Sequence, residues 1–368
     1  MKEVHSMETD VTRRSVFGDV SNELERVREE FHNLLRAEEL PNGQGLLAAI
    51  QTPGKLLRPG LLLLIGKNHE RAEQSRGVLI ASALEMLHTA TLLHDDVIDQ
   101  SSVRRRRPTA ARLVGNRASI LFGDYLFAKS FNMLAQMGEF RALERLLKAI
   151  GICVKGELAE QANLFNFSLT EEEYMNITNM KTAELFAASC WLGSHIHGDC
   201  DGECDALSRF GRLFGQGFQI VDDLLDFVGD AGSMGKPSGQ DLLHGVVTLP
   251  TILALRDASD AMLSADTLGR GYATERELGR AGGPGETLER AEAARVRRMV
   301  LESGALRTTM DIAKNCFAEA VESVAGLNRD DGLYLKLRAL CEMSAKRGED
   351  ALSKFERHQR DYADEQGA

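Results

Sequence analysis

Two short aspartate clusters carry the strongest chemical signal in this sequence. One runs from Asp95 to Asp99 and the other from Asp222 to Asp226, and both have the pattern Asp-Asp-x-x-Asp. Each follows an apolar segment with helical spacing, so the first and last aspartates of a cluster share one helix face. Carboxylates crowded in apolar surroundings repel one another and need a cation to be stable. Their oxygens suit Mg²⁺, which binds through a few carboxylates together with substrate phosphates.

An arginine run follows the first cluster and suits the same kind of ligand. It covers residues 104–107, and arginine makes paired hydrogen bonds to phosphate oxygens. A single acidic or basic run is usually a solvated surface. Here both aspartate clusters follow apolar residues, so we expect a functional site for an anionic ligand. Because four consecutive arginines cannot all face inward, we expect Arg104 and Arg105 to be the ones that bind.

A second group of potential ligands lies in one polar stretch. It consists of His195, His197, Asp199, Cys200 and Cys204. Their spacing matches no standard zinc motif, so we favour a structural interpretation over a zinc site. The sequence contains no nucleophile elbow, Walker loop or dinucleotide fingerprint. The expected chemistry therefore rests on the carboxylates and on the cations near them.

The composition predicts a helical protein. The chain has 368 residues, of which 43% are hydrophobic and only 6% aromatic, and helix-favouring residues dominate over alternating β-branched runs. Apolar segments with helical spacing succeed one another with short breaks, which predicts an all-α bundle of about ten or more helices. The net charge of −11 argues against nucleic-acid binding, which needs a basic surface.

The predicted helices position the candidate residues. Helices are expected over residues 21–37, 77–99, 119–137, 144–165, 205–227 and 248–255. The aspartate clusters end the second and the fifth of these. A capping box from Thr170 to Glu173 predicts the start of a helix that carries Lys181 and Thr182. We expect a flexible leader over residues 1–20, a helical domain over 21–368, and a flexible insertion over 263–290, which is polar and rich in glycine.

The sequence shows no signal for export or membrane insertion. Its first residues are polar and lack an apolar signal-peptide core, and no apolar run approaches the roughly 20 residues that span a bilayer. The six cysteines are scattered, unlike those of a small secreted domain. We therefore expect a cytoplasmic protein without a transmembrane segment.

Further motifs accompany the aspartate clusters in a fixed order. They are Gly54-Lys55-x-x-Arg58-Pro59, the segment 85–99, Arg104-Arg105-x-x-Pro108-Thr109, Gly123-Asp124-Tyr125, Lys181-Thr182-Ala183, the segment 217–226, Gly235-Lys236-Pro237-x-Gly239-x-Asp241 and Thr248-Leu249-Pro250. This order resembles the trans-isoprenyl diphosphate synthase (polyprenyl synthase) family over roughly residues 50–350, and most of all its medium- and long-chain, octaprenyl-type members. A looser match is Glu160-Gln161, where the family has Gly-Glu-x-x-Gln.

The resemblance implies a single-domain isoprenoid-synthase bundle around a central cavity, and a homodimer. It implies head-to-tail condensation of isopentenyl diphosphate with an allylic diphosphate (dimethylallyl, geranyl, farnesyl or geranylgeranyl). The implied ligands of Mg²⁺, three ions with diphosphate bound, are Asp95, Asp99 and Asp222, supported by Asp96, Asp223 and Asp226. The residues implied to grip the allylic diphosphate are Arg104, Lys181 and Lys236, with Thr182 and Gln219 nearby. Those implied to bind isopentenyl diphosphate are Lys55, Arg58, His88 and Arg105.

Small residues just before the first aspartate cluster bear on product length. In the family the side chains one turn before this motif limit the growing chain, and short-chain members often have Phe or Tyr there. Here the positions hold Ala90 and Thr91, with Leu87 deeper along the helix. We expect a trans-polyprenyl product longer than farnesyl diphosphate, and a loose membrane association for its release.

Two other functions fit part of the pattern. A class I terpene cyclase shares the fold and the first aspartate motif, but it normally replaces the second, which is intact here. A non-catalytic partner subunit of a heteromeric prenyl synthase tends to lose aspartates, whereas this chain keeps all six.

Overall fold

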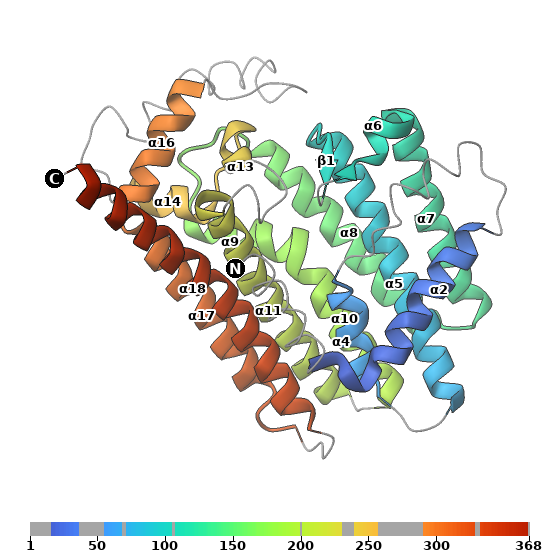
Figure 1. Ribbon diagram of the computed structural model, residues 1–368. Coiled ribbons are helices and arrows are strands. Elements are labelled where there is room, and N and C mark those ends of the chain that lie inside the picture. Colours follow the sequence, from blue (N-terminus) through green and yellow to red (C-terminus); the bar gives the residue numbers. More distant parts are fainter. Residues whose placement is uncertain are drawn as a thin grey trace. The chain divides into compact units, whose positions relative to one another are not determined.

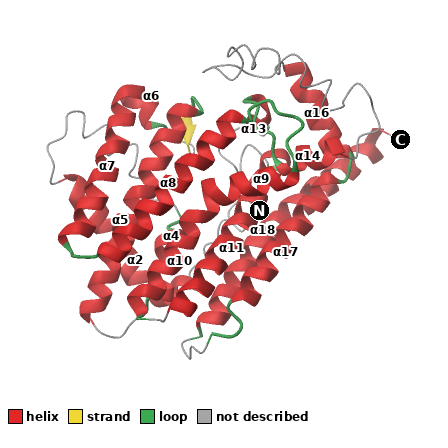
Figure 2. Ribbon diagram, turned by 180° about the vertical axis from the view of Figure 1, so that it is seen from behind, coloured by secondary structure: helices red, strands yellow, loops and turns green. Residues whose placement is uncertain are grey.

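The computed structural model describes most of the chain, and the described part is helical almost throughout (Figures 1 and 2). The described residues are 16–36, 55–67, 71–104, 107–198, 201–229, 239–256, 290–327 and 332–366. Strand pairing within these ranges is confined to a small hairpin, β1 (Val103–Arg104) with β2 (Arg107–Pro108). The prediction of an all-α fold with about ten or more helices is therefore confirmed.

The helices group into two compact units. The first unit comprises residues 1–152, 184–212 and 320–340, and the second comprises 153–183, 213–319 and 341–368. The limits of the units fall inside long helices, among them α8 (Phe140–Ala162) and α11 (Asp201–Val228). The first aspartate cluster belongs to the first unit and the second cluster to the second.

In the first unit, α5 (Arg71–Ile98) makes its most extensive contacts with three other helices. These are α2 (Ser21–Arg36), α4 (Leu57–Ile65) and α7 (Asn116–Gln136). The short α6 (Ala110–Val114) packs on α5 and α7, and α10 (Glu184–His197) packs on α4. The residues of α5 are apolar on nearly all sides, and such a helix becomes stable by burial in the middle of a bundle.

In the second unit, α9 (Glu171–Thr178) leads directly into a π-helical turn, η2 (Asn179–Ala183). The predicted capping box starts α9, since the Thr170 and Glu173 side chains each accept the backbone N–H of the other residue. The remaining helices are α13 (Gln240–Leu243), α14 (Leu249–Arg256), α16 (Arg290–Glu302), α17 (Ala305–Ser323) and α18 (Leu333–Gln366). In both views α17 and α18 run side by side (Figures 1 and 2).

The expected helices are found with shifts of a few residues at their ends. The helix expected over 77–99 begins earlier, at Arg71, and the one expected over 205–227 begins at Asp201. Most of the predicted insertion at 263–290 lies outside the described residues, because α14 ends at Arg256 and α16 begins at Arg290. Arg105, Lys236, Asp199 and Cys200 also lie outside them.

The end of the expected leader is part of the helical structure. Val16, Phe17 and Val20 are buried, and the 3-10 turn η1 (Gly18–Val20) leads into α2. The carboxylate of Asp19 binds the ammonium groups of Lys67, at 2.8 Å, and Lys336. Hydrogen bonds from Lys336 and Lys67 lower the pKa of Asp19 to about 2. Residues 16–20 are thus not part of a flexible leader, and the rest of the expected leader lies outside the described residues.

Among the described residues, one helix is long and apolar enough to cross a membrane. The short apolar runs in the sequence did not suggest such a helix. It is the portion Gln74–Ile98 of α5. The apolar window of this segment is 61% buried inside the fold, and core helices of globular proteins pass the same test. The finding is therefore weak evidence for a span.

Candidate active site

The first aspartate cluster lies at the carboxyl end of α5. The Asp99 N–H donates to the Asp95 carbonyl at 2.8 Å, so the helical hydrogen bonding extends one residue past Ile98 and keeps these two aspartates on one face. Asp96, which is 4% exposed, accepts a 2.7 Å hydrogen bond from the Arg104 guanidinium. The structure thus places Arg104 at the first cluster, whereas its predicted contact with a phosphate stays a prediction.

A glycine on α7 lets the residue before this cluster pack closely. A Cβ at Gly123 would come within 2.3 Å of the His94 Nε2 atom, so only glycine leaves room for this imidazole. The His94 Nε2 atom also lies 3.0 Å from the Ile120 carbonyl oxygen. Gly123 of the Gly-Asp-Tyr motif therefore allows α7 to pack closely against His94 at the end of α5.

Two of the residues expected to bind isopentenyl diphosphate lie together in the first unit. The Arg58 Nη1 and His88 Nε2 atoms are 3.1 Å apart. The Arg58 guanidinium also stacks on the Phe186 ring, 4.1 Å from its centroid, an arrangement that desolvation strengthens. Leu56, just before α4, has a positive φ of 49°, a strained conformation of the kind that gathers at functional sites.

The second aspartate cluster ends α11 and contains a carboxylate held by two donors. Asp223 accepts from the Tyr174 hydroxyl at 2.6 Å and from the Gln219 amide at 2.8 Å. Gln219 in turn accepts from the Thr182 hydroxyl at 2.8 Å. Burial, and then the nearby Asp241 carboxylate, raise the pKa of Asp223 well above its usual range, since both disfavour the charged form.

The flanking aspartates of this cluster have their own partners. Asp222 accepts a 2.7 Å hydrogen bond from Arg347 of α18. The backbone of Asp226 accepts from the Gly239 N–H at 2.8 Å, and its carboxylate accepts from the Asp241 N–H at 3.4 Å. The segment that begins at Gly239 is thus fixed against the end of α11, and it brings a further carboxylate to the cluster.

Lys181 lies on the π-helical turn and faces two glutamates of α8. Its ammonium group is 2.8 Å from Glu157 and also binds Glu160. A Cβ at Gly156 would come within 2.5 Å of the Lys181 backbone nitrogen, so glycine allows α8 and this turn to touch. Single π-helical turns within α-helices are frequent at functional sites. Glu160, the loose match to the family pattern, therefore contacts a candidate substrate-binding residue.

The donor atoms of both clusters fit Mg²⁺. They are carboxylate oxygens, the hard ligands that this ion prefers. The carboxylates of Asp222 and Asp241 act on that of Asp223 as like charges that raise its pKa, so a cation in their midst would relieve repulsion. Across the described ranges no three His, Cys, Asp or Glu side chains already form a metal site.

The described part of the stretch from His195 to Cys204 has structural contacts. His195 stacks on Trp191 with ring centroids 5.1 Å apart, and burial lowers the pKa of His195. His197 lies 3.2 Å from the Lys67 carbonyl oxygen, and Cys204 is buried. These contacts agree with the structural interpretation that the spacing favoured.

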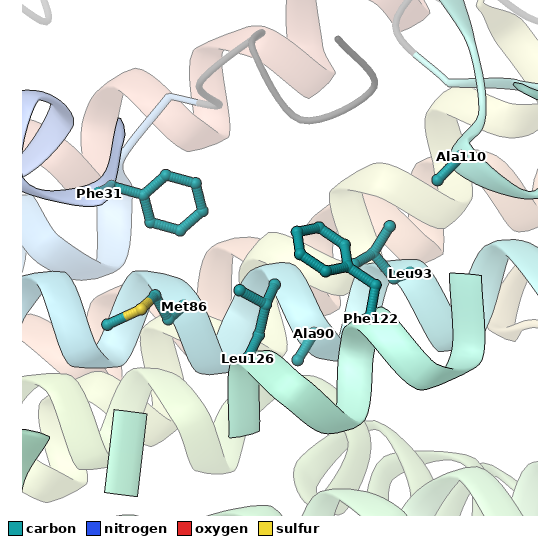
Figure 3. Packing of buried hydrophobic residues seen from close by; sticks show 7 residues of the cluster. All are labelled: Phe31, Met86, Ala90, Leu93, Ala110, Phe122 and Leu126. Atoms are coloured by element: carbon teal, nitrogen blue, oxygen red, sulfur yellow. The ribbon is translucent and has the colours of Figure 1, made fainter. Parts of the chain in front are cut away.

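The surroundings of Ala90 are filled by side chains from neighbouring helices. Ala90 is fully buried, in a cluster with Phe31, Met86, Leu93, Ala110, Phe122 and Leu126. Figure 3 shows Phe122 and Leu126 of α7 beside Ala90. Leu87 is also fully buried, whereas Thr91 is partly exposed and donates to the His88 carbonyl. The methyl group of Ala90 therefore lies among larger apolar side chains, Phe122 among them.

Three residues of this site were not predicted from the sequence. They are Tyr174, Phe186 and Arg347. Glu173, in the capping box, marked the start of α9, and that was the one sequence signal close to Tyr174. Arg347 lies in a helix that carries no recognised motif, so its contact with Asp222 was visible only in the structure.

An all-helical fold with two such aspartate clusters, each beside a cationic or hydrogen-bonding partner, defines an enzyme of the isoprenoid-synthase class. The chain belongs to the polyprenyl synthetase family, whose model matches residues 44–281. It is therefore a prenyltransferase.

Individual relatives agree with this membership. Heptaprenyl diphosphate synthase component 2 of Geobacillus stearothermophilus is 38% identical over 244 residues, which are 66% of this chain and 76% of that protein. Octaprenyl diphosphate synthase of Escherichia coli (strain K12) is 38% identical over 202 residues, or 55% of this chain and 62% of that protein. A decaprenyl diphosphate synthase from Rhodobacter capsulatus has a similar crystal structure, with a TM-score of 0.77 at 30% identity, covering 91% of this chain and 99% of that one.

Proposed function

We propose that this chain condenses isopentenyl diphosphate head-to-tail with an allylic diphosphate and makes a trans-polyprenyl diphosphate longer than farnesyl diphosphate. The observation that carries the proposal is the pair of intact aspartate clusters in a member of this family. A terpene cyclase is disfavoured by the intact second cluster, because Asp222, Asp223 and Asp226 are all present.

Mg²⁺ binds through the carboxylates of both clusters in this proposal, with three ions when diphosphate is bound. The proposed ligands are Asp95, Asp99 and Asp222, supported by Asp96, Asp223 and Asp226. Bound Mg²⁺ supplies stabilisation of the negative charge that develops on the departing pyrophosphate. Each cluster already holds a supporting contact, Arg104 on Asp96 and Arg347 on Asp222, which orients the carboxylates before substrate arrives.

The cationic residues near the clusters divide between the two substrates. For the allylic diphosphate we propose Arg104, Lys181 and Lys236, with Thr182 and Gln219 nearby. For isopentenyl diphosphate we propose Lys55, Arg58, His88 and Arg105. The stacked and hydrogen-bonded guanidinium of Arg58 supports this division, since a fixed guanidinium loses less entropy when it grips a phosphate. Arg105 and Lys236 rest on the family resemblance.

The carbon chemistry proposed here needs no protein nucleophile. The allylic substrate loses pyrophosphate to give a carbocation in apolar surroundings that exclude water. The double bond of isopentenyl diphosphate attacks this cation, and loss of a proton to the released pyrophosphate restores an alkene. The role of the chain is to bind, orient and desolvate both substrates.

An apolar stripe on α8 supports a homodimer. Phe140, Leu147, Val154 and Leu158 are all exposed, from 49% to 68%, and their spacing puts them on one side of the helix. Four large apolar side chains exposed in a row usually mark a protein interface. We expect twice the chain mass in sedimentation velocity, and a Leu147→Glu/Leu158→Glu variant at the single mass. A wild-type monomer would contradict the homodimer.

The test of the function is product analysis with the purified chain. Given Mg²⁺, isopentenyl diphosphate and farnesyl diphosphate, we expect products longer than geranylgeranyl diphosphate on chromatography. With dimethylallyl or geranyl diphosphate as the primer instead, products that stop at farnesyl diphosphate would contradict the long-chain assignment. If the chain alone formed no product but turnover began after a second subunit was added, this chain would be one subunit of a heteromeric synthase. The proposed location is the cytoplasm, with loose membrane association for release of the apolar product.

A further inference from the structure

A tyrosine of α9 bonds to the buried carboxylate of the second aspartate cluster. Tyr174 and Asp223 are both buried, and the tyrosine hydroxyl donates to the Asp223 Oδ2 atom at 2.6 Å. The other oxygen, Oδ1, accepts from Gln219 at 2.8 Å. Both oxygens of this carboxylate thus accept from neutral donors, which offsets part of the cost of burying it.

The same tyrosine lies seven residues before Lys181 in a continuous helical segment formed by α9 and the π-helical turn. That segment meets the Asp223 side chain by two routes. Tyr174 bonds to it directly, and Thr182 reaches it through Gln219, with bonds of 2.8 Å at each step. The capping box at Thr170 fixes the first turn of α9. The capping box therefore fixes the start of the segment. Further along, Tyr174 bonds directly to Asp223, and Thr182 is linked to Asp223 through Gln219.

We propose that Tyr174 is a positioning residue of the metal–diphosphate site. Its hydroxyl holds the Asp223 carboxylate in one orientation and links the second aspartate cluster to the turn that carries Lys181 and Thr182. This inference rests on the proposed function, because it assigns Asp223 to that site.

The charges around Asp223 explain why such a restraint is needed. Asp222 and Asp241 both act on Asp223 as like charges, and repulsion would turn an unrestrained carboxylate away from them. Tyr174 adds no charge of its own, so it restrains the carboxylate without neutralising it. A cation that enters later then finds the carboxylate oxygens already oriented.

The test is Tyr174→Phe, which removes one oxygen atom and keeps the ring. We expect the Mg²⁺ concentration for half-maximal rate to rise about 10- to 100-fold, the usual effect of losing a partner that orients a metal ligand. The KM for isopentenyl diphosphate should not change, since Lys55, Arg58 and His88 belong to the other unit. The matched control is Thr309→Val in the same unit, which removes a buried hydroxyl bonded only locally, to the Ala305 carbonyl at 2.8 Å.

A binding measurement gives a readout apart from turnover. Titration calorimetry with Mg²⁺ and inorganic pyrophosphate should show weaker binding for Tyr174→Phe and wild-type binding for Thr309→Val. If Tyr174→Phe does not fold, meta-fluorotyrosine at position 174 of the otherwise unchanged chain provides a second test, because it keeps the hydroxyl group. Its ¹⁹F resonance should shift as Mg²⁺ and pyrophosphate bind.

Two failures are distinguishable. An active wild-type enzyme whose Tyr174→Phe variant keeps the wild-type Mg²⁺ dependence and pyrophosphate binding overturns the role of Tyr174. So does a fluorine resonance that stays in place while binding is complete. A wild-type chain that binds Mg²⁺ and pyrophosphate but forms no prenyl product, alone or with a partner, overturns the proposed function instead.

Discussion

Replacing Asp95 with alanine is expected to lower the condensation rate on the order of 10²- to 10³-fold, or more, without unfolding the protein. The reason is that Asp95 is proposed to hold Mg²⁺, and loss of one group that stabilises charge on the leaving pyrophosphate has effects of this size. The measurement is the rate of product formation at saturating substrates over a range of Mg²⁺ concentrations. Added Mg²⁺ should recover only part of the loss.

A surface aspartate provides the matched control for Asp95→Ala. Asp311 lies on α17 with its side chain 74% exposed, so Asp311→Ala removes the same group from a site without proposed chemistry. It should keep the wild-type rate. The melting temperature of Asp95→Ala should equal or exceed that of the wild type, because fewer like charges then share the end of α5. Unchanged turnover in Asp95→Ala would favour a non-catalytic role for the chain.

The aspartate clusters could be predicted because their signal is local. An apolar helix followed by Asp-Asp-x-x-Asp fixes both the element and the face on which Asp95 and Asp99 lie. The structure bears this out at the end of α5, where Asp99 bonds back to Asp95. The capping box at Thr170 is local in the same way, since two side chains three residues apart start the helix between them.

Partners far apart in the sequence could not be predicted in this way. Tyr174 lies 49 residues from Asp223, and Arg347 lies 125 residues from Asp222. Helical periodicity says which face of α9 or α18 is buried, but it does not say which residue of another helix that face will meet. Phe186 illustrates the same limit, because an apolar residue within a buried helix gives no sign that an arginine will stack on it.

Product length is the second property for which we expect a large effect. Ala90→Phe should shorten the longest product by several isoprene units, and Ala90→Leu by fewer. A product that grows along this face of α5 has to pass Ala90, beside which Phe122 of α7 already lies (Figure 3), and a second aromatic ring at this point would block its path. The measurement is the product distribution with farnesyl diphosphate as primer. Overpacking should also destabilise the fold by about 1–3 kcal/mol.

A substitution at Ala81 separates the two expected effects of Ala90→Phe, which are a shorter product and a less stable fold. Ala81 is also fully buried on α5, and nine residues of helix put it on the opposite face. Ala81→Phe should therefore destabilise the fold to a similar extent and leave product length unchanged. If both Ala81→Phe and Ala90→Phe shortened the product, loss of stability would explain the change in product length.

A compensating substitution tests the space itself. If the added ring at position 90 shortens the product by filling the volume beside Phe122, then Phe122→Ala in the same chain should return that volume and restore the longer product. Phe122→Ala alone should lengthen the product beyond that of the wild type, because it removes a large ring from the buried cluster around Ala90. Independent, additive changes in product length would mean that the two positions act on different parts of the growing chain, since coupling is expected only for residues in contact.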